Sequence, residues 1–66
     1  MQVQVNGDTM LLPAGATIAV LIEQMALAGK RLAVEVNEDI VPRSQHVEFA
    51  LNEGDKVEVV HAIGGG

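Results

Sequence analysis

The chain opens with MQVQVNGDTMLL, residues 1–12, and this stretch decides the fold. Apolar and polar side chains alternate over residues 1–5, which is the period-two pattern of a half-buried strand. Asn6-Gly7 follows, and this pair is the strongest short signal for a hairpin because a type I′ turn needs positive φ at both central positions. A two-residue loop pairs Val3 with Met10, so the apolar side chains of both strands share one face. The stretch therefore predicts an antiparallel hairpin.

A helical pattern follows the hairpin. Pro13–Ala16 breaks the second strand, and Thr17 is predicted as the N-cap. Apolar residues then recur at the spacing of a single helical face, at Ile18, Leu21, Ile22 and Met25. We expect the helix to end near Gly29, with Lys30 and Arg31 beside the negative end of its dipole.

Three further strands complete the predicted sheet. Residues 32–36 alternate as a third strand, and a turn at residues 37–39 leads to a short fourth strand at Ile40-Val41. Pro42 stops that strand, which suits an edge position. Residues 56–61 carry apolar side chains on both faces, which is typical of a strand inside a sheet.

The connection before the last strand is the least regular part of the sequence. Ser44–Leu51 contains Val47, Phe49 and Leu51, and we expect an irregular or short helical segment that covers one end of the core. Asn52-Glu53-Gly54-Asp55 predicts a turn.

A single helix must bury its apolar face on the sheet, which predicts a two-layer α+β domain. With the last strand central and parallel to the first, one mixed sheet packs against a single main helix. That arrangement is the β-grasp.

Composition excludes several classes of function. The chain has no cysteine, so disulfides, thiolate metal sites and thiol nucleophiles are excluded. Nine acidic against four basic residues give a formal charge of −5, and Phe49 is the sole aromatic residue, which together argue against nucleic-acid binding. The longest apolar run, Ile18–Ile22, is too short to cross a membrane. We expect a cytoplasmic protein that is a monomer when free.

The sequence offers no convincing catalytic or metal site. His46 and His61 are the only histidines, and we expect both to be surface residues and not zinc ligands. Ser44 and His46 are two positions apart, a spacing that does not make side chains face each other on a helix. Glu38-Asp39 is expected to be a solvated turn and not an acid–base pair. We therefore predict no enzyme activity, no bound cofactor and no metal.

The most informative feature is the run Gly64-Gly65-Gly66. Because glycine has no Cβ, such a segment can thread a channel too narrow for side chains. Three extended residues reach about 10 Å, enough to carry a terminal carboxylate into another protein's active site. We predict a domain over residues 1–63 and a flexible tail over residues 64–66, with a merely frayed terminus as the alternative.

The chain as a whole resembles the ubiquitin-like sulfur carrier proteins of bacterial thiamine biosynthesis. The resemblance rests on the Asn6-Gly7 hairpin, the segment NEDIVPR at residues 37–43, EGDKV at residues 53–57 and the final glycines. The Val-Pro-Arg turn and the Gly-Gly end are its most specific parts. It implies a β-grasp fold.

The resemblance also implies a mechanism. In that family an adenylating, ubiquitin-activating-like enzyme uses ATP to activate the terminal carboxylate, here that of Gly66. Sulfur from cysteine, delivered by a donor such as a cysteine desulfurase, displaces AMP and leaves a thiocarboxylate, which gives its sulfur to thiazole synthase. Gly65 would be the second residue of the diglycine, and Gly64 departs from the family pattern of two glycines. Arg43 matches the family turn but receives no role.

Two alternatives stay open at this point. One is a sulfur carrier for molybdopterin synthesis or tRNA thiolation, or a ubiquitin-like modifier. The other is a non-covalent β-grasp interaction module with inert glycines. In the carrier interpretation Ile63, with Val60, is expected to dock onto the partner enzymes, because exposed apolar residues beside a functional tail often mark an interface. Packing of Ile63 on its own sheet is the competing expectation.

Overall fold

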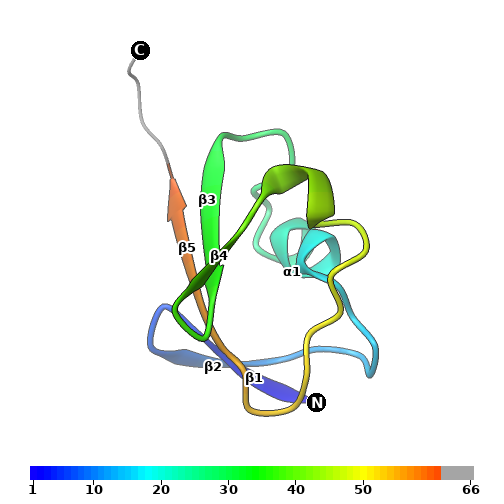
Figure 1. Cartoon of the computed structure of the whole chain (residues 1–66). Helices are drawn as coiled ribbons and strands as arrows, with labels where there is room; N and C mark the ends of the chain where they lie inside the picture. Colours follow the sequence, from blue (N-terminus) through cyan, green and yellow to red (C-terminus); the bar gives the residue numbers. More distant parts are fainter. Residues whose placement is uncertain (62–66) are drawn as a thin grey trace.

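The structure, a computed structural model, describes residues 1–61 (Figure 1). One helix lies across one face of a five-stranded sheet, and the strand order is β2-β1-β5-β3-β4. In chain order the elements are β1 (Gln2–Val5), β2 (Asp8–Leu11), α1 (Ile18–Gln24), β3 (Leu32–Val36), β4 (Asp39–Val41), the 3₁₀ turn η1 (Arg43–Gln45) and β5 (Lys56–His61). β5 is central and runs parallel to β1, and β4 is an edge strand, as the sequence predicts.

The first hairpin forms in the register that the sequence predicts. Val3 lies opposite Met10, and Val5 lies opposite Asp8. Asn6 and Gly7 have φ values of 51° and 89°, the two positive values that a type I′ turn requires. The predicted turn chemistry and the observed strand pairing therefore agree.

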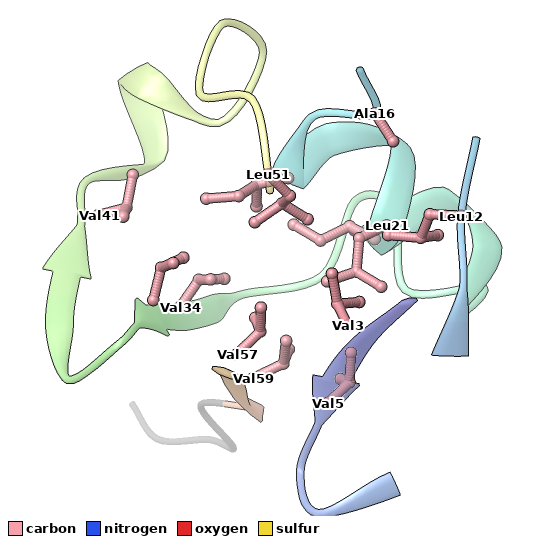
Figure 2. Packing of buried hydrophobic residues seen from close by; sticks show 13 residues of the cluster. Val3, Val5, Leu12, Ala16, Leu21, Val34, Val41, Leu51, Val57 and Val59 are labelled. Carbon is pink, nitrogen blue, oxygen red and sulfur yellow. The ribbon is translucent and has the colours of Figure 1, made fainter. Parts of the chain in front are cut away.

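The helix packs its predicted apolar face on the sheet (Figure 2). The Thr17 hydroxyl accepts a hydrogen bond from the Val20 N–H at 3.4 Å, which confirms the N-cap. Ile18 and Leu21 are fully buried, and Met25 packs against the core while partly exposed. The buried apolar residues come from both layers: Val3, Val5, Leu12, Ala16, Ile18, Leu21, Ile22, Val34, Val36, Val41, Leu51, Val57 and Val59.

The helix ends earlier than the sequence predicts. Its last residue is Gln24, and Ala26 takes the left-handed conformation with φ of 60°. The Ala26 N–H donates to the Glu23 carbonyl and the Leu27 N–H donates to the Ile22 carbonyl, both at 3.0 Å. These two bonds form a Schellman motif, which closes the helix with alanine where glycine is usual.

The prediction of a helix end near Gly29 was therefore wrong. Leu27 follows the Schellman turn and packs against the core, so its burial favours the early end of the helix. Gly29 has positive φ in a separate turn, and the last helical turn contains no basic residue. Lys30 and Arg31 lie outside the last helical turn, to which the effect of the helix dipole is limited.

The connection from β4 to β5 contains η1 and covers one end of the core, as expected. Leu51 is buried and Phe49 packs against the core in part, but Val47 is 76% exposed and does not contribute to it. Asp55 closes the following turn, since its carboxylate accepts from the Asn52 N–H at 2.8 Å.

Candidate functional site

The candidate site residues lie at and beyond the end of β5. Val60 is within β5 and is 57% exposed on the sheet face that α1 does not cover. Ile63 and Gly64-Gly65-Gly66 lie outside the described residues. The structure therefore describes the strand that leads to these residues and its surroundings.

β5 is held by a strand on each side. It pairs antiparallel with the whole of β3, from Val57 opposite Val36 to His61 opposite Leu32. It pairs in parallel with β1 at Val57 and Val5. β5 therefore has a strand on each side at its start, while its end at His61 pairs with β3 alone.

The Asn6 side chain extends the pairing of β1 with β5 beyond the point where β1 turns away. The Asn6 backbone N–H donates to the Val57 carbonyl at 2.9 Å. Its side-chain Oδ1 then accepts from the Val59 N–H at 2.9 Å, and its Nδ2 donates to the Val59 carbonyl at 3.2 Å. The side-chain amide of Asn6 thus makes the two hydrogen bonds to β5 that a further backbone residue of β1 would make. Sequence reasoning found Asn6 as a turn residue but missed this second role.

Asn37 anchors the opposite end of β5. Its Oδ1 accepts from the Lys56 N–H at 3.0 Å, and its Nδ2 donates to the Asp55 carboxylate at 3.0 Å. Asn37 is also the first residue of the β3–β4 turn, in which Asn37 and Glu38 have φ values of 51° and 74°. The two hairpins therefore hold β5 through equivalent asparagines.

The uncovered sheet face combines apolar and acidic side chains. Val60 lies opposite Ala33, and Ile40 on β4 is 72% exposed. Glu35 of β3 lies between its two register partners, Ile40 of β4 and Glu58 of β5, so two carboxylates are directly opposite each other. Like charges at such a pair are destabilising, and a cation from a partner would relieve the repulsion. This face therefore presents exposed apolar side chains beside two opposed carboxylates.

His46 corrects the expectation that both histidines are surface residues. His46 is only 6% exposed, and its Nε2 hydrogen-bonds to the Val41 carbonyl at 3.1 Å. The segment after η1 folds back onto the helix, where the His46 carbonyl accepts from the Ala19 N–H at 3.0 Å. No sequence pattern indicated this burial. His61 is exposed, as expected.

The other candidates are not brought together. Ser44 and Glu38 are exposed on separate elements, and Asp39 begins β4. Within residues 1–61, no group of three or more histidine and acidic side chains is placed to hold a metal ion. In the same residues no helix is long and apolar enough to span a membrane.

The central parallel strand, the flanking hairpins and the single helix define a β-grasp domain. A crystal structure of the thiamine biosynthesis protein ThiS from Geobacter metallireducens has the same fold, with a TM-score of 0.83, 25% sequence identity and full coverage of both chains. The sequence profile of the ThiS family matches residues 3–66. The chain belongs to the ThiS family.

Curated relatives fall into two groups by length. The chain is 33% identical to the sulfur carrier protein ThiS of Escherichia coli over 66 residues, the full length of both. It is also 38% identical to a thiazole synthase of Paramagnetospirillum magneticum over all 66 residues, but it spans only 20% of that protein. A relative that the chain matches from end to end is thus named as a carrier and not as an enzyme.

Proposed function

We propose that this chain is the sulfur carrier of thiamine biosynthesis and that sulfur is loaded on the carboxylate of Gly66. The observation that carries the proposal is the match over full length to the carrier of Escherichia coli, together with the glycines at residues 64–66.

The chemistry needs activation because a carboxylate has no good leaving group. A Gly66 oxygen attacks the α-phosphorus of ATP, and pyrophosphate leaves. Hydrosulfide, released from the persulfide of the sulfur donor by a thiol reductant that becomes a disulfide, then attacks the acyl carbon, and AMP departs with the electron pair of the C–O bond. The product is a thiocarboxylate, a sulfur nucleophile that stays attached to its carrier. An adenylating enzyme and a sulfur donor such as a cysteine desulfurase supply every catalytic group.

Thiazole synthase is the proposed acceptor. A region similar to this whole chain forms one fifth of a protein named thiazole synthase. Covalent linkage raises the effective concentration of one domain at another, so such an arrangement suits a carrier that delivers to that enzyme. Sulfur loading and sulfur transfer to thiazole synthase are both proposed to take place in the cytoplasm.

Docking is proposed to use the uncovered sheet face around Val60, with Ile63. Val60→Asp should raise the KM of the adenylating enzyme for the carrier about tenfold, the effect of losing roughly 1.4 kcal/mol of binding. Leu11→Asp is the matched control, because Leu11 is 70% exposed on the edge strand β2, away from the end of β5. Equal KM values for the two variants would contradict docking at Val60.

The function itself is tested by intact mass after incubation with ATP, the adenylating enzyme and a sulfide source. We expect ATP-dependent exchange of one carboxylate oxygen for sulfur, and then transfer of that sulfur in the presence of thiazole synthase. Loading without transfer would indicate a carrier for molybdopterin or tRNA thiolation. Absence of loading would indicate a non-covalent interaction module.

A further inference from the structure

A small cavity lies at the same end of the sheet as the last residue of β5. Its wall is formed by α1, the α1–β3 connection, β3 and the segment at η1, through Ile22, Gly29, Lys30, Leu32, Arg43 and His46. Leu32 is the register partner of His61, so the cavity is adjacent to the end of β5. Figure 1 shows the α1–β3 connection and η1 at that end of the molecule.

The charge of this cavity is opposite to that of the protein. The chain has four lysines and arginines against nine acidic residues, yet Lys30 and Arg43 both line the cavity. No carboxylate is among the described residues that line it. A concentration of positive charge inside a concave, partly apolar wall attracts anions more strongly than the same charges spread over a surface.

One wall of the cavity is a buried and hydrogen-bonded side chain, that of His46. It is 94% buried, since only 6% of its surface is exposed, and the hydrogen bond of Nε2 to the Val41 carbonyl fixes its ring. A carbonyl oxygen can only accept, so Nε2 donates in this bond, and His46 contributes to the wall of the cavity and not to its charge. Ile22 and Leu32 form the apolar part of the wall, which lowers the local dielectric constant and strengthens polar interactions there.

We propose that this cationic cavity, in which Lys30 and Arg43 supply the charge and His46 forms part of the wall, binds a single phosphate-type oxyanion. Arginine offers a planar fork of donors and lysine a compact charge, the pair of groups that commonly bind phosphate. The two formal positive charges of Lys30 and Arg43 balance the charge of a phosphate dianion, whereas a carboxylate carries a single negative charge. The cavity volume of about 70 Å³ is far below the roughly 300 Å³ at which pockets for whole small molecules begin, so it fits one group.

The oxyanion has two sources, free inorganic phosphate and the phosphate of a nucleotide. The site is independent of sulfur loading, because it needs only the described domain. It also gives Arg43 a role that the family resemblance does not.

The test is a titration of the full chain followed by backbone amide NMR. Sodium phosphate should shift the signals of Gly29, Lys30, Arg43 and His46 in a saturable way, while sodium chloride at equal ionic strength should not. Arg43→Gln and Lys30→Gln should each weaken phosphate binding about tenfold, the loss expected for one charge-assisted hydrogen bond. Both residues are exposed, so the variants should keep the wild-type spectrum elsewhere.

Lys56→Gln is the matched control, because it removes the same charge from an exposed position at the other end of β5. It should leave phosphate binding unchanged. Tighter binding of AMP than of phosphate would assign the site to a nucleotide phosphate, and equal affinity would assign it to the phosphate group alone. Shifts equal to those with chloride, or equal weakening by Lys56→Gln, would overturn the proposal.

Discussion

The two hairpins of the molecule use the same turn with different residues. The β1–β2 hairpin turns at Asn6-Gly7 and the β3–β4 hairpin turns at Asn37-Glu38, and all four residues have positive φ. Glycine adopts this conformation at no steric cost, whereas glutamate carries a Cβ that makes it unfavourable. The second turn is therefore formed at a cost that the first avoids.

Both hairpins have an asparagine at the first turn position, and its side chain explains the shared geometry. In each, the first turn residue is an asparagine whose side chain hydrogen-bonds β5, at Val59 from Asn6 and at Lys56 from Asn37. Asparagine tolerates the left-handed conformation and also carries a donor and an acceptor. The turns thus close the hairpins and fix the strand that leads to the proposed site of loading.

The largest effect is expected from a substitution in the core, on which both hairpins pack. Leu21 is fully buried in the core between the helix and the sheet (Figure 2), so Leu21→Ala should lower the free energy of unfolding by about 2–5 kcal/mol. Urea unfolding measures the change, and hydrogen exchange should show both hairpins losing protection together. A loss below about 1 kcal/mol would mean that the helix does not support the sheet as described.

A smaller effect should separate the two asparagines. Asn6→Gly keeps the turn conformation but leaves the N–H and carbonyl of Val59 without partners, at a cost of about 1–2 kcal/mol. Asn37→Gly should cost less, because its hydrogen bonds are exposed and water can replace them. Urea unfolding of both variants gives the comparison.

The added freedom of glycine in the unfolded chain is common to both variants, so the difference isolates the anchors. Hydrogen exchange at the Val59 amide should accelerate in Asn6→Gly alone. Equal destabilisation by the two substitutions would contradict a special role for Asn6.

The smallest effect tests the residue that differs between the turns. Glu38→Gly should stabilise the protein by up to about 1 kcal/mol, because it removes the strain of a side chain at φ of 74°. Gly7→Ala should destabilise it by about 1 kcal/mol, and backbone strain is the sole cause there, since a Cβ at Gly7 would meet nothing within 4 Å.

Glu38→Ala is the control for the turn at Asn37. It removes the carboxylate but keeps a Cβ at positive φ, so thermal unfolding should show little change. Stabilisation by alanine equal to that by glycine would show that the charge of Glu38, and not its backbone conformation, limits the second turn.

These comparisons also show where the sequence was informative about the fold. Asn6-Gly7 predicted the register of the first hairpin because turn geometry and hydrophobic alternation agree. The predicted end of α1 was wrong because nothing in the local sequence indicates positive φ at Ala26. The packing of Leu27 against the core favours that conformation, and it depends on tertiary structure.

The candidate site was predicted from the sequence only in part. The glycine run and the family resemblance identified Gly66 as the proposed reacting residue, and Val60, named from the sequence as a docking residue, is exposed. The anchoring by Asn6 and the burial of His46 could not be predicted, because both depend on residues that are distant in the sequence or lie in an irregular segment.

The measurement that most directly tests the central claim is ATP-dependent sulfur loading, followed by intact mass, of three tail variants. Deletion of Gly66 shortens the reach by about 3.5 Å, and Gly65→Val adds a side chain where the channel is proposed to admit bare backbone, so both should abolish loading without changing stability. Gly64→Ala should load normally, because the family pattern needs two glycines. Normal loading of the Gly66 deletion would contradict the carrier mechanism.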